Sequence, residues 1–189
     1  MTNNGLINYT SLFCVALVWM SCGTPSSPDP IENSAQEAAA PSPMLVILDA
    51  ERTGINFVNR VIEDDSANYL NYRYIYNSGG VATGDLDNDG LPEIVCVSNR
   101  NGGAIYKNNW DLKFRDVTKT AGFNLVGLWA TGVCMMDANA DGLLDIYVCG
   151  SGPGYWPVKY RRNRLYINKG ALKFVDEAAE RGVADEGHH

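Results

Sequence analysis

Two acidic stretches of the chain have the residue types and the spacing of a cation-binding loop. The first runs from Asp85 to Glu93, and the second, 52 residues later, runs from Asp137 to Asp145. Both have oxygen-bearing side chains at positions 1, 3, 5 and 9 and a glycine at position 6. Alternate residues of a tight loop can direct carboxylates at one centre, and glycine permits the sharp reversal. Such a set of oxygen ligands favours Ca²⁺ over the smaller Mg²⁺, which demands a more regular octahedron.

The residues after each loop predict that it joins two β-strands. An EF-hand loop shares positions 1, 3, 5 and 6 but has glutamate at position 12, where this chain has Cys96 and Val148. The runs 93–97 and 145–149 are rich in β-branched and apolar residues, which favour strands. The alternative interpretation is a pair of acidic surface turns that bind no metal. The repeated register favours the cation site.

The charge of the chain is concentrated in these loops. The 189 residues are 46% hydrophobic, as in a globular domain, and their formal net charge is −7. Seven acidic residues lie in the two loops, so the negative charge is largely local. This acidity disfavours nucleic acid as a partner.

The amino terminus has the pattern of an export signal. An apolar run at 12–20 is too short to cross a bilayer, and Ser21-Cys22-Gly23 follows it. The Ser-Cys pair resembles the lipobox of bacterial lipoproteins, although Trp19 replaces the usual aliphatic residue and no basic residue precedes the run. Residues 1–22 are therefore predicted to be a signal peptide with lipidation at Cys22; ordinary cleavage and an uncleaved anchor are the alternatives. The predicted location is the outer membrane or cell surface, with membrane contact through the lipid anchor only.

Residues 23–43 contain five of the eight prolines and are predicted to be a flexible tether, or equally a generic disordered leader. Three cysteines remain beyond the signal, at 96, 134 and 149, all within apolar strand patterns. They are predicted to be small buried hydrophobic residues. Cys134 and Cys149 flank the second loop on paired strands, so a bridge between them is the alternative.

A longer repeat surrounds the loops. Residues 105–108 and 112–116 return as 165–168 and 172–176, at an offset of 60, so eight extra residues lie around 151–162. Each unit is predicted to have four strands, which in the first unit lie at about 80–85, 93–98, 103–108 and 112–117. Four short strands repeated at this period indicate an all-β fold of β-propeller blades, each a four-stranded antiparallel unit.

The stretch Gly80–Ile94 resembles an FG-GAP or VCBS-type repeat, the blade unit of calcium-binding β-propellers. Residues 53–57 and 76–80 are similar to the lead-in of bacterial lipoproteins of this kind that carry a carboxy-terminal ASPIC/UnbV domain. The resemblance implies two bound Ca²⁺ ions. The implied ligands are the side chains of Asp85, Asp87, Asp89 and Glu93 with the Leu91 carbonyl, and those of Asp137, Asn139, Asp141 and Asp145 with the Leu143 carbonyl.

The repeat also predicts how the chain is divided. Residues 44–79 form a lead-in with a possible strand of a further blade, and the two repeats occupy 80–123 and 129–183. Residues 184–189 are expected to begin a truncated third repeat, although the two final histidines also suggest a tag. Because a propeller closes with four to eight blades, about two full blades predict an incomplete ring and an N-terminal fragment.

No catalytic site is predicted. The only histidines are His188 and His189, and the glycines of 150–154 lack the following helix and Lys-Ser/Thr pair of a phosphate-binding loop. The stretch around 151–162 has binding character through Tyr155, Trp156, Tyr160, Arg161 and Arg162, which could contact a ligand or simply cover a neighbouring blade.

Two classes of function remain open at this point. The first is a non-catalytic, calcium-stabilised propeller that serves adhesion or binds a carbohydrate or an envelope protein. The second is the N-terminal part of a polysaccharide lyase or hydrolase whose catalytic residues lie in other blades.

Overall fold

A computed structural model describes residues 45–77 and 79–186, which lie within one compact unit, Leu45–His189. The predicted signal peptide, Cys22, the tether and residues 187–189 lie outside the described residues, and those predictions remain untested. The elements, in chain order, are α1 (Ala50–Thr53), β1 (Gly80–Gly84), β2 (Glu93–Val97), β3 (Gly103–Asn108), β4 (Phe114–Asp116), α2 (Thr118–Ala121), β5 (Ala130–Met136), β6 (Asp145–Gly150), the 3-10 helix η1 (Val158–Tyr160), β7 (Arg164–Asn168) and β8 (Phe174–Asp176).

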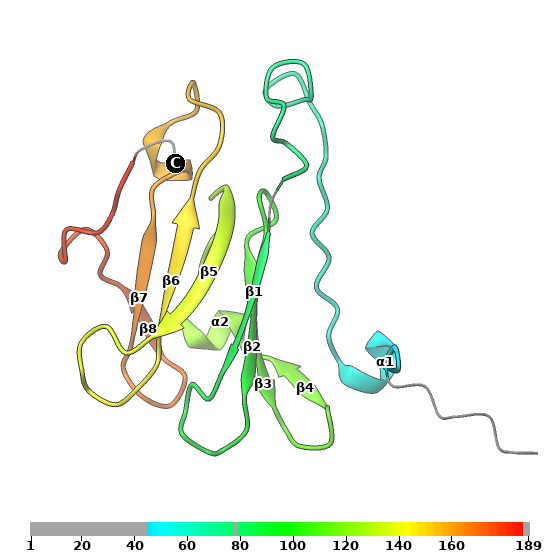
Figure 1. Ribbon diagram of the computed structural model, residues 1–189, viewed down its shortest axis with the longest axis vertical. Helices are drawn as coiled ribbons and strands as arrows, with labels where there is room; N and C mark the ends of the chain where they lie inside the picture. Colours follow the sequence, from blue (N-terminus) through cyan, green and yellow to red (C-terminus); the bar gives the residue numbers. More distant parts are fainter. Residues whose placement is uncertain (1–44, 78, 187–189) are drawn as a thin grey trace, which may run out of the picture. The chain divides into compact units, whose positions relative to one another are not determined.

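The fold is nearly all β and consists of two four-stranded sheets (Figure 1). The strand orders are β1-β2-β3-β4 and β5-β6-β7-β8, and every neighbouring pair is antiparallel. The predicted all-β class and the four predicted strands of the first unit are confirmed. We call the first sheet blade 1 and the second blade 2, because their meander order and side-by-side arrangement are those of propeller-like blades.

Each acidic loop connects the first two strands of its blade. The register pairs Gly84 with Glu93 in blade 1 and Met136 with Asp145 in blade 2. Each loop therefore lies between the last paired residues of two adjacent strands. The two loops lie at the same end of the blades (Figure 1). The prediction that these are strand-to-strand loops, unlike EF-hand loops, is confirmed.

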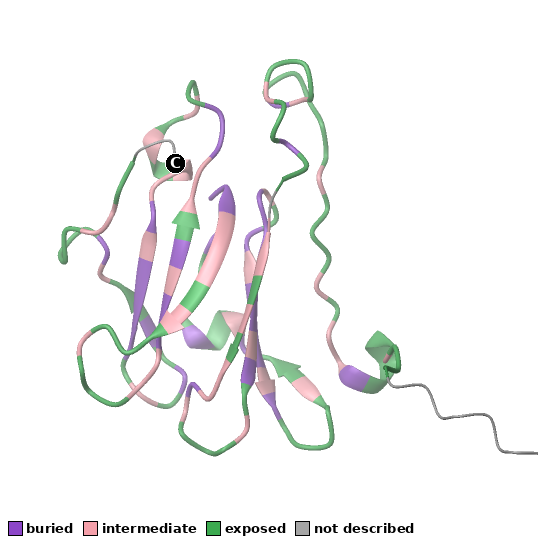
Figure 2. Ribbon diagram, in the orientation of Figure 1, coloured by how far each residue is buried: buried purple, intermediate pink, exposed green. Residues whose placement is uncertain are grey.

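The blades contact each other through their first strands, β1 and β5. Glycines on β1 allow the two strands to approach closely. A Cβ atom on Gly84 would lie 2.7 Å from the Met135 Sδ, and one on Gly80 would lie 3.2 Å from the Val133 nitrogen. The main core between the blades consists of buried residues (Figure 2), and its members include Leu86, Val95, Val97 and Ile105 from blade 1 and Ile146, Val148, Tyr166 and Phe174 from blade 2. Burial of these side chains stabilises the paired blades by the hydrophobic effect.

The prediction for the cysteines was wrong for two of the three. Cys96 is buried, but Cys134 and Cys149 are exposed, and all three are free thiols. The repeat explains the error, because Val97, the counterpart of Cys149 in blade 1, is buried against blade 2. The same face of blade 2 leaves Cys149 exposed, so an apolar strand pattern alone does not decide burial.

The lead-in covers blade 1 without extending it. Among its described residues no strand forms, and an isolated bridge between Asp64 and Ala67 is the nearest approach to one. The Asn56 N–H donates to the Tyr106 hydroxyl of β3 at 3.2 Å.

Among the described residues, none of the helices has the length and apolar character needed to span a membrane.

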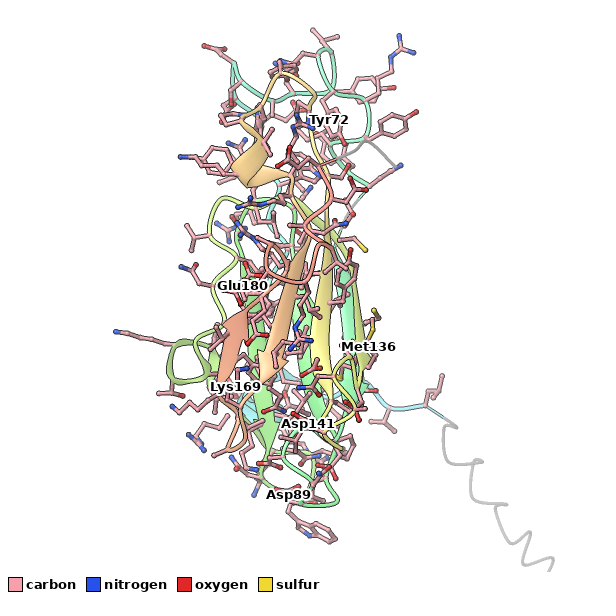
Figure 3. The ribbon with its side chains drawn as sticks, turned by 90° about the vertical axis from the view of Figure 1, so that its left-hand side faces the viewer. Tyr72, Asp89, Met136, Asp141, Lys169 and Glu180 are labelled. Carbon is pink, nitrogen blue, oxygen red and sulfur yellow. The ribbon has the colours of Figure 1, made fainter. Side chains whose placement is uncertain are left out.

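A second small core joins the lead-in to the extra residues of blade 2. Trp129 is fully buried there with Ala67 and Ile75. The Trp156 ring meets Trp129 edge-on, with ring centroids 5.4 Å apart. This aromatic cluster lies at the end of the blades opposite the acidic loops, as the labelled Tyr72, Asp89 and Asp141 show (Figure 3).

Candidate metal centre

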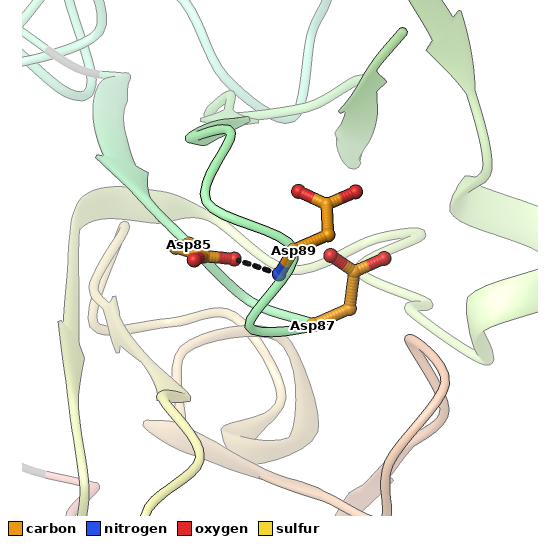
Figure 4. A group of neighbouring side chains, drawn as sticks. All are labelled: Asp85, Asp87 and Asp89. Atoms are coloured by element: carbon orange, nitrogen blue, oxygen red, sulfur yellow. Dashed lines mark hydrogen bonds between the residues drawn. The ribbon is translucent and has the colours of Figure 1, made fainter.

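The first acidic loop, residues 85–92, is shaped by the carboxylate at its first position. One Asp85 oxygen accepts the Asp89 N–H at 3.1 Å (Figure 4), and the other accepts the Gly90 N–H at 2.8 Å. Gly90 has a φ of 87°, a left-handed conformation that glycine adopts without a steric penalty. The loop is therefore wound around Asp85 by its own backbone amides.

Three carboxylates of this loop converge. One oxygen each from Asp85, Asp87 and Asp89 lies within 4.8 Å of the others. The Lys107 ammonium, on β3, donates to Asp89 at 2.8 Å and also to Asp87. Burial lowers the pKa of Lys107, but the two carboxylates outweigh burial and raise it above the ordinary value. Lys107 in turn lowers the pKa of Asp89.

These residues fit a hard divalent cation. The donors are carboxylate oxygens, which Ca²⁺ prefers, and a cationic group already lies against two of them. One oxygen of Asp87 is buried without a hydrogen-bond partner, so it retains capacity to bind a cation. The donor set could therefore hold Ca²⁺, and a bound ion would displace the Lys107 ammonium.

The second loop, residues 137–144, repeats this backbone arrangement with different side-chain partners. Asp137 accepts the N–H groups of Asp141 at 3.1 Å and Gly142 at 2.9 Å, as Asp85 does in the first loop. The Asn139 amide donates to Asp141 at 2.8 Å. The Leu143 N–H and then Asn139 lower the pKa of Asp141. No lysine reaches this loop from β7, where Ile167 stands at the position of Lys107.

The acids at the ninth position have a role that sequence reasoning missed. Glu93 and Asp145 are both fully buried. Glu93 accepts the Leu86 N–H at 2.8 Å and the Asn108 N–H at 3.3 Å. Burial raises the pKa of Glu93, and these two N–H groups act in the opposite direction.

Asp145 makes the equivalent bonds in blade 2. It accepts the Ala138 N–H at 2.9 Å and the Asn168 N–H at 2.7 Å. Each ninth-position acid thus ties its loop to the end of the third strand of its blade. Because a carboxylate offers about four lone-pair sites, Glu93 and Asp145 can make these bonds and still bind an ion. Their role as Ca²⁺ ligands stays a prediction, as does that of the Leu91 and Leu143 carbonyls.

Hydrogen bonds also join the two loops directly. The Asn88 amide donates to the Gly142 carbonyl at 3.2 Å. The Asn168 amide donates to the Leu86 carbonyl at 2.7 Å and to the Leu144 carbonyl at 3.1 Å. The two candidate cation sites are therefore neighbours held in one network.

The extra residues of blade 2 are largely engaged in packing. The Tyr155 hydroxyl and the Trp156 indole N–H both donate to the Ser66 carbonyl, at 2.7 and 3.3 Å. Arg161 donates to the Trp156 and Glu186 carbonyls, at 3.1 and 3.0 Å. These contacts favour the covering role over ligand contact.

A hollow of about 450 Å³ lies beside these residues, with Trp156 and Tyr160 in its lining. The Arg100 guanidinium lies 5.4 Å from the Trp156 ring centroid, and the Lys159 ammonium lies 4.7 Å from that of Tyr160. Each of these rings therefore already has a cation over it, which leaves less aromatic surface for stacking on a ligand. The predicted ligand contacts of the extra residues, including Arg162, stay a prediction.

Residues 66–148 match the family of FG-GAP-like repeats, so the chain contains such a repeat. The match runs from the lead-in through blade 1 and the second acidic loop into β6. Cartilage acidic protein 1 of Xenopus tropicalis is also similar, with 27% identity over 107 residues. That similarity covers 56% of this chain but 16% of the relative, so it extends to a small part of that protein.

Proposed function

We propose that the chain is a calcium-stabilised propeller module that acts as a non-catalytic binding or scaffold part at the bacterial cell envelope. The observation that carries the proposal is the convergence of Asp85, Asp87 and Asp89 within 4.8 Å. The same loop backbone recurs in blade 2, around Asp137. Two loops of one design, bonded to each other at the same end of neighbouring blades, support a shared structural role.

The expected contribution of calcium is to stability. Extracellular calcium modules commonly have dissociation constants of about 0.1 to 1 mM. With free calcium at ten times that value, linkage contributes roughly 1.4 kcal/mol per site. Two independent sites would contribute about 3 kcal/mol, a large share of a typical unfolding free energy of about 5 to 15 kcal/mol.

Calorimetric titration of the metal-free, full-length protein with CaCl₂ tests the proposal. We expect two sites, loss of one in Asp87→Ala and in Asp141→Ala, and a higher melting temperature in millimolar calcium than in chelator. Asp111→Ala is the matched control, because that acid is exposed and lies in the β3–β4 turn. An unchanged melting temperature in chelator, or variants that respond to calcium as the parent does, would refute the calcium site.

Envelope location is a separate part of the proposal and has its own test. It rests on the apolar run and the Ser21-Cys22 pair in the sequence. Intact-mass analysis of the envelope fraction should show a lipid on Cys22, and Cys22→Ala should release the protein. A parent protein without lipid on Cys22 would refute the lipid anchor and leave the calcium proposal unaffected.

A further inference from the structure

A buried hydrogen-bonded chain connects the ninth-position acids of the two loops. It begins at Glu93, whose carboxylate accepts the Leu86 N–H at 2.8 Å. The Leu86 carbonyl then accepts the Asn168 side-chain amide at 2.7 Å, and the Asn168 N–H donates to Asp145 at 2.7 Å. All four residues are buried, Glu93, Leu86 and Asp145 fully and Asn168 with 1% of its surface exposed.

Of these four hydrogen-bonded residues, Asn168 is the one whose side chain bonds to the other blade. Its amide bonds the carbonyl before the ninth position of its own loop, Leu144, and the carbonyl at the second position of the neighbouring loop, Leu86. The equivalent residue in blade 1, Asn108, donates to the Pro92 carbonyl of its own blade at 3.1 Å. Both asparagine oxygens also accept a turn N–H, from Gly170 and from Trp110. The two residues therefore differ chiefly in the bond to Leu86.

We propose that Asn168 couples the two cation loops, so that calcium in one loop raises the calcium affinity of the other. This inference rests on the proposed calcium binding. Leu86 lies between two predicted ligands, Asp85 and Asp87, so an ion held by them restricts the Leu86 carbonyl. A Leu86 carbonyl with less freedom to move also limits the motion of the Asn168 side chain, and the Asn168 N–H then limits the motion of Asp145. The first ion has then already met part of the entropic cost of ordering these groups. The second ion binds more tightly as a result, which is positive cooperativity without a change of shape.

Electrostatic repulsion between two dications acts in the opposite direction. Asp89, Asp137 and Asp141 are exposed, so salt weakens this repulsion over a screening length of about 8 Å at physiological ionic strength, whereas salt has little effect on the buried Asn168 bonds. We therefore expect the ordering effect to prevail at 0.15 M salt, with a coupling of about five-fold or more in affinity, the lower end of typical values.

Calcium titration of the full-length protein and its loop variants measures this coupling. Asp141→Ala blocks the second loop, so it gives the affinity of the first loop alone, and Asp89→Ala gives that of the second loop alone. The parent should bind its second ion about five-fold more tightly than these separate affinities predict. This excess affinity should be reduced in Asn168→Ala and should persist in Asn108→Ala, while the direct bond from Asn88 to Gly142 remains in both variants. A parent with independent sites, or an Asn168→Ala protein that keeps the full excess affinity, would overturn the coupling.

Amide hydrogen exchange gives a second readout that needs no Asn168 variant. In Asp141→Ala, where calcium is confined to the first loop, we expect slower exchange of the Asn168 and Ala138 N–H groups, which both donate to Asp145. Unchanged exchange at both amides while the first loop binds calcium would overturn the coupling. Absence of calcium binding at either loop would instead refute the proposed function, so the two failures are distinguishable.

Discussion

Blade 1 and blade 2 have the same strand order and the same loop backbone but balance the loop charge differently. At the third loop position blade 1 has Asp87, which Lys107 pairs with. Blade 2 has the neutral Asn139 there and Ile167 in place of the lysine. The extra acid and the extra base occur together, so the two loops have equal formal charge when Lys107 is counted. The acid and the lysine are therefore present together in blade 1 and absent together in blade 2. The strand order that the two blades share requires neither residue.

The largest expected effect concerns what the blades share. Glu93→Ala removes the acceptor of two backbone N–H groups, those of Leu86 and Asn108. Loss of an acceptor for a buried donor costs about 1 to 3 kcal/mol, so we expect a loss of about 3 kcal/mol. Asp145→Ala should cost a similar amount. Urea unfolding in chelator measures both without a contribution from metal.

An exposed acid provides the control for this pair. Glu180→Ala should change the unfolding free energy by less than about 0.5 kcal/mol, because Glu180 is exposed and has no positive φ, as is usual for surface substitutions. If either buried acid proves as tolerant as Glu180, the view that these carboxylates fasten the loops to the strands is wrong.

The charge difference between the blades predicts the next largest effect. Lys107→Ile leaves Asp87 and Asp89 without their cationic partner, so without metal we expect a melting temperature about 3 °C lower. With the competing ammonium gone, calcium should bind the first loop about five-fold more tightly. Thermal melts in chelator and calcium titrations report the two effects separately.

The double variant Asp87→Asn/Lys107→Ile gives blade 1 the pair found in blade 2. It should recover most of the melting temperature lost in Lys107→Ile, because the unpaired acid is removed along with the base. Additive losses in the double variant would show that the two residues act independently.

The β3–β4 turn of blade 1 and the β7–β8 turn of blade 2 predict a smaller effect of opposite sign. Trp110 has a φ of 74°, while Gly170 has a φ of 84° at the same place in blade 2. The left-handed conformation costs a non-glycine residue about 1 kcal/mol, and the Trp110 side chain is largely exposed. Trp110→Gly should therefore stabilise the protein by about 1 kcal/mol in urea unfolding, and Gly170→Ala should destabilise it equally. A stabilising Gly170→Ala would contradict this account.

The smallest effect lies at the fourth loop position. Asn88 and Ala140 have φ values of 57° and 60°, and asparagine tolerates this region better than alanine. Ala140→Asn should stabilise the protein by about 0.5 kcal/mol. Ala138→Asn, at a neighbouring loop position without positive φ, should give no such gain in the same melting assay.

Local spacing predicted the strands and the loops, because strand period, glycine position and acid register are all properties of short stretches of sequence. The roles of Lys107 and Asn168 were missed, since each depends on a partner loop brought close by the fold. Comparison of the two repeats could have pointed to Lys107, because Ile167 stands at the same position of the second repeat. No signal in a single repeat distinguishes Asn168 from Asn108.

The cysteines show the same limit. Cys149 and its counterpart Val97 have equally apolar neighbours in the sequence. Their burial differs because one face of blade 1 lies against blade 2, whereas the same face of blade 2 leaves its cysteine exposed. Which face of a repeated sheet is covered depends on the neighbour, and that information is not contained in the strand.

The glycines of β1 have a consequence for curvature. Where Gly80 and Gly84 face β5, the backbones approach more closely than larger side chains would permit, while β2 and β3 contribute the larger Val95, Val97 and Ile105 to the core between the blades. The contact surface of blade 1 therefore tapers toward its first strand. Such a taper sets the angle between neighbouring blades. A larger residue at Gly84 would reduce the taper and change that angle.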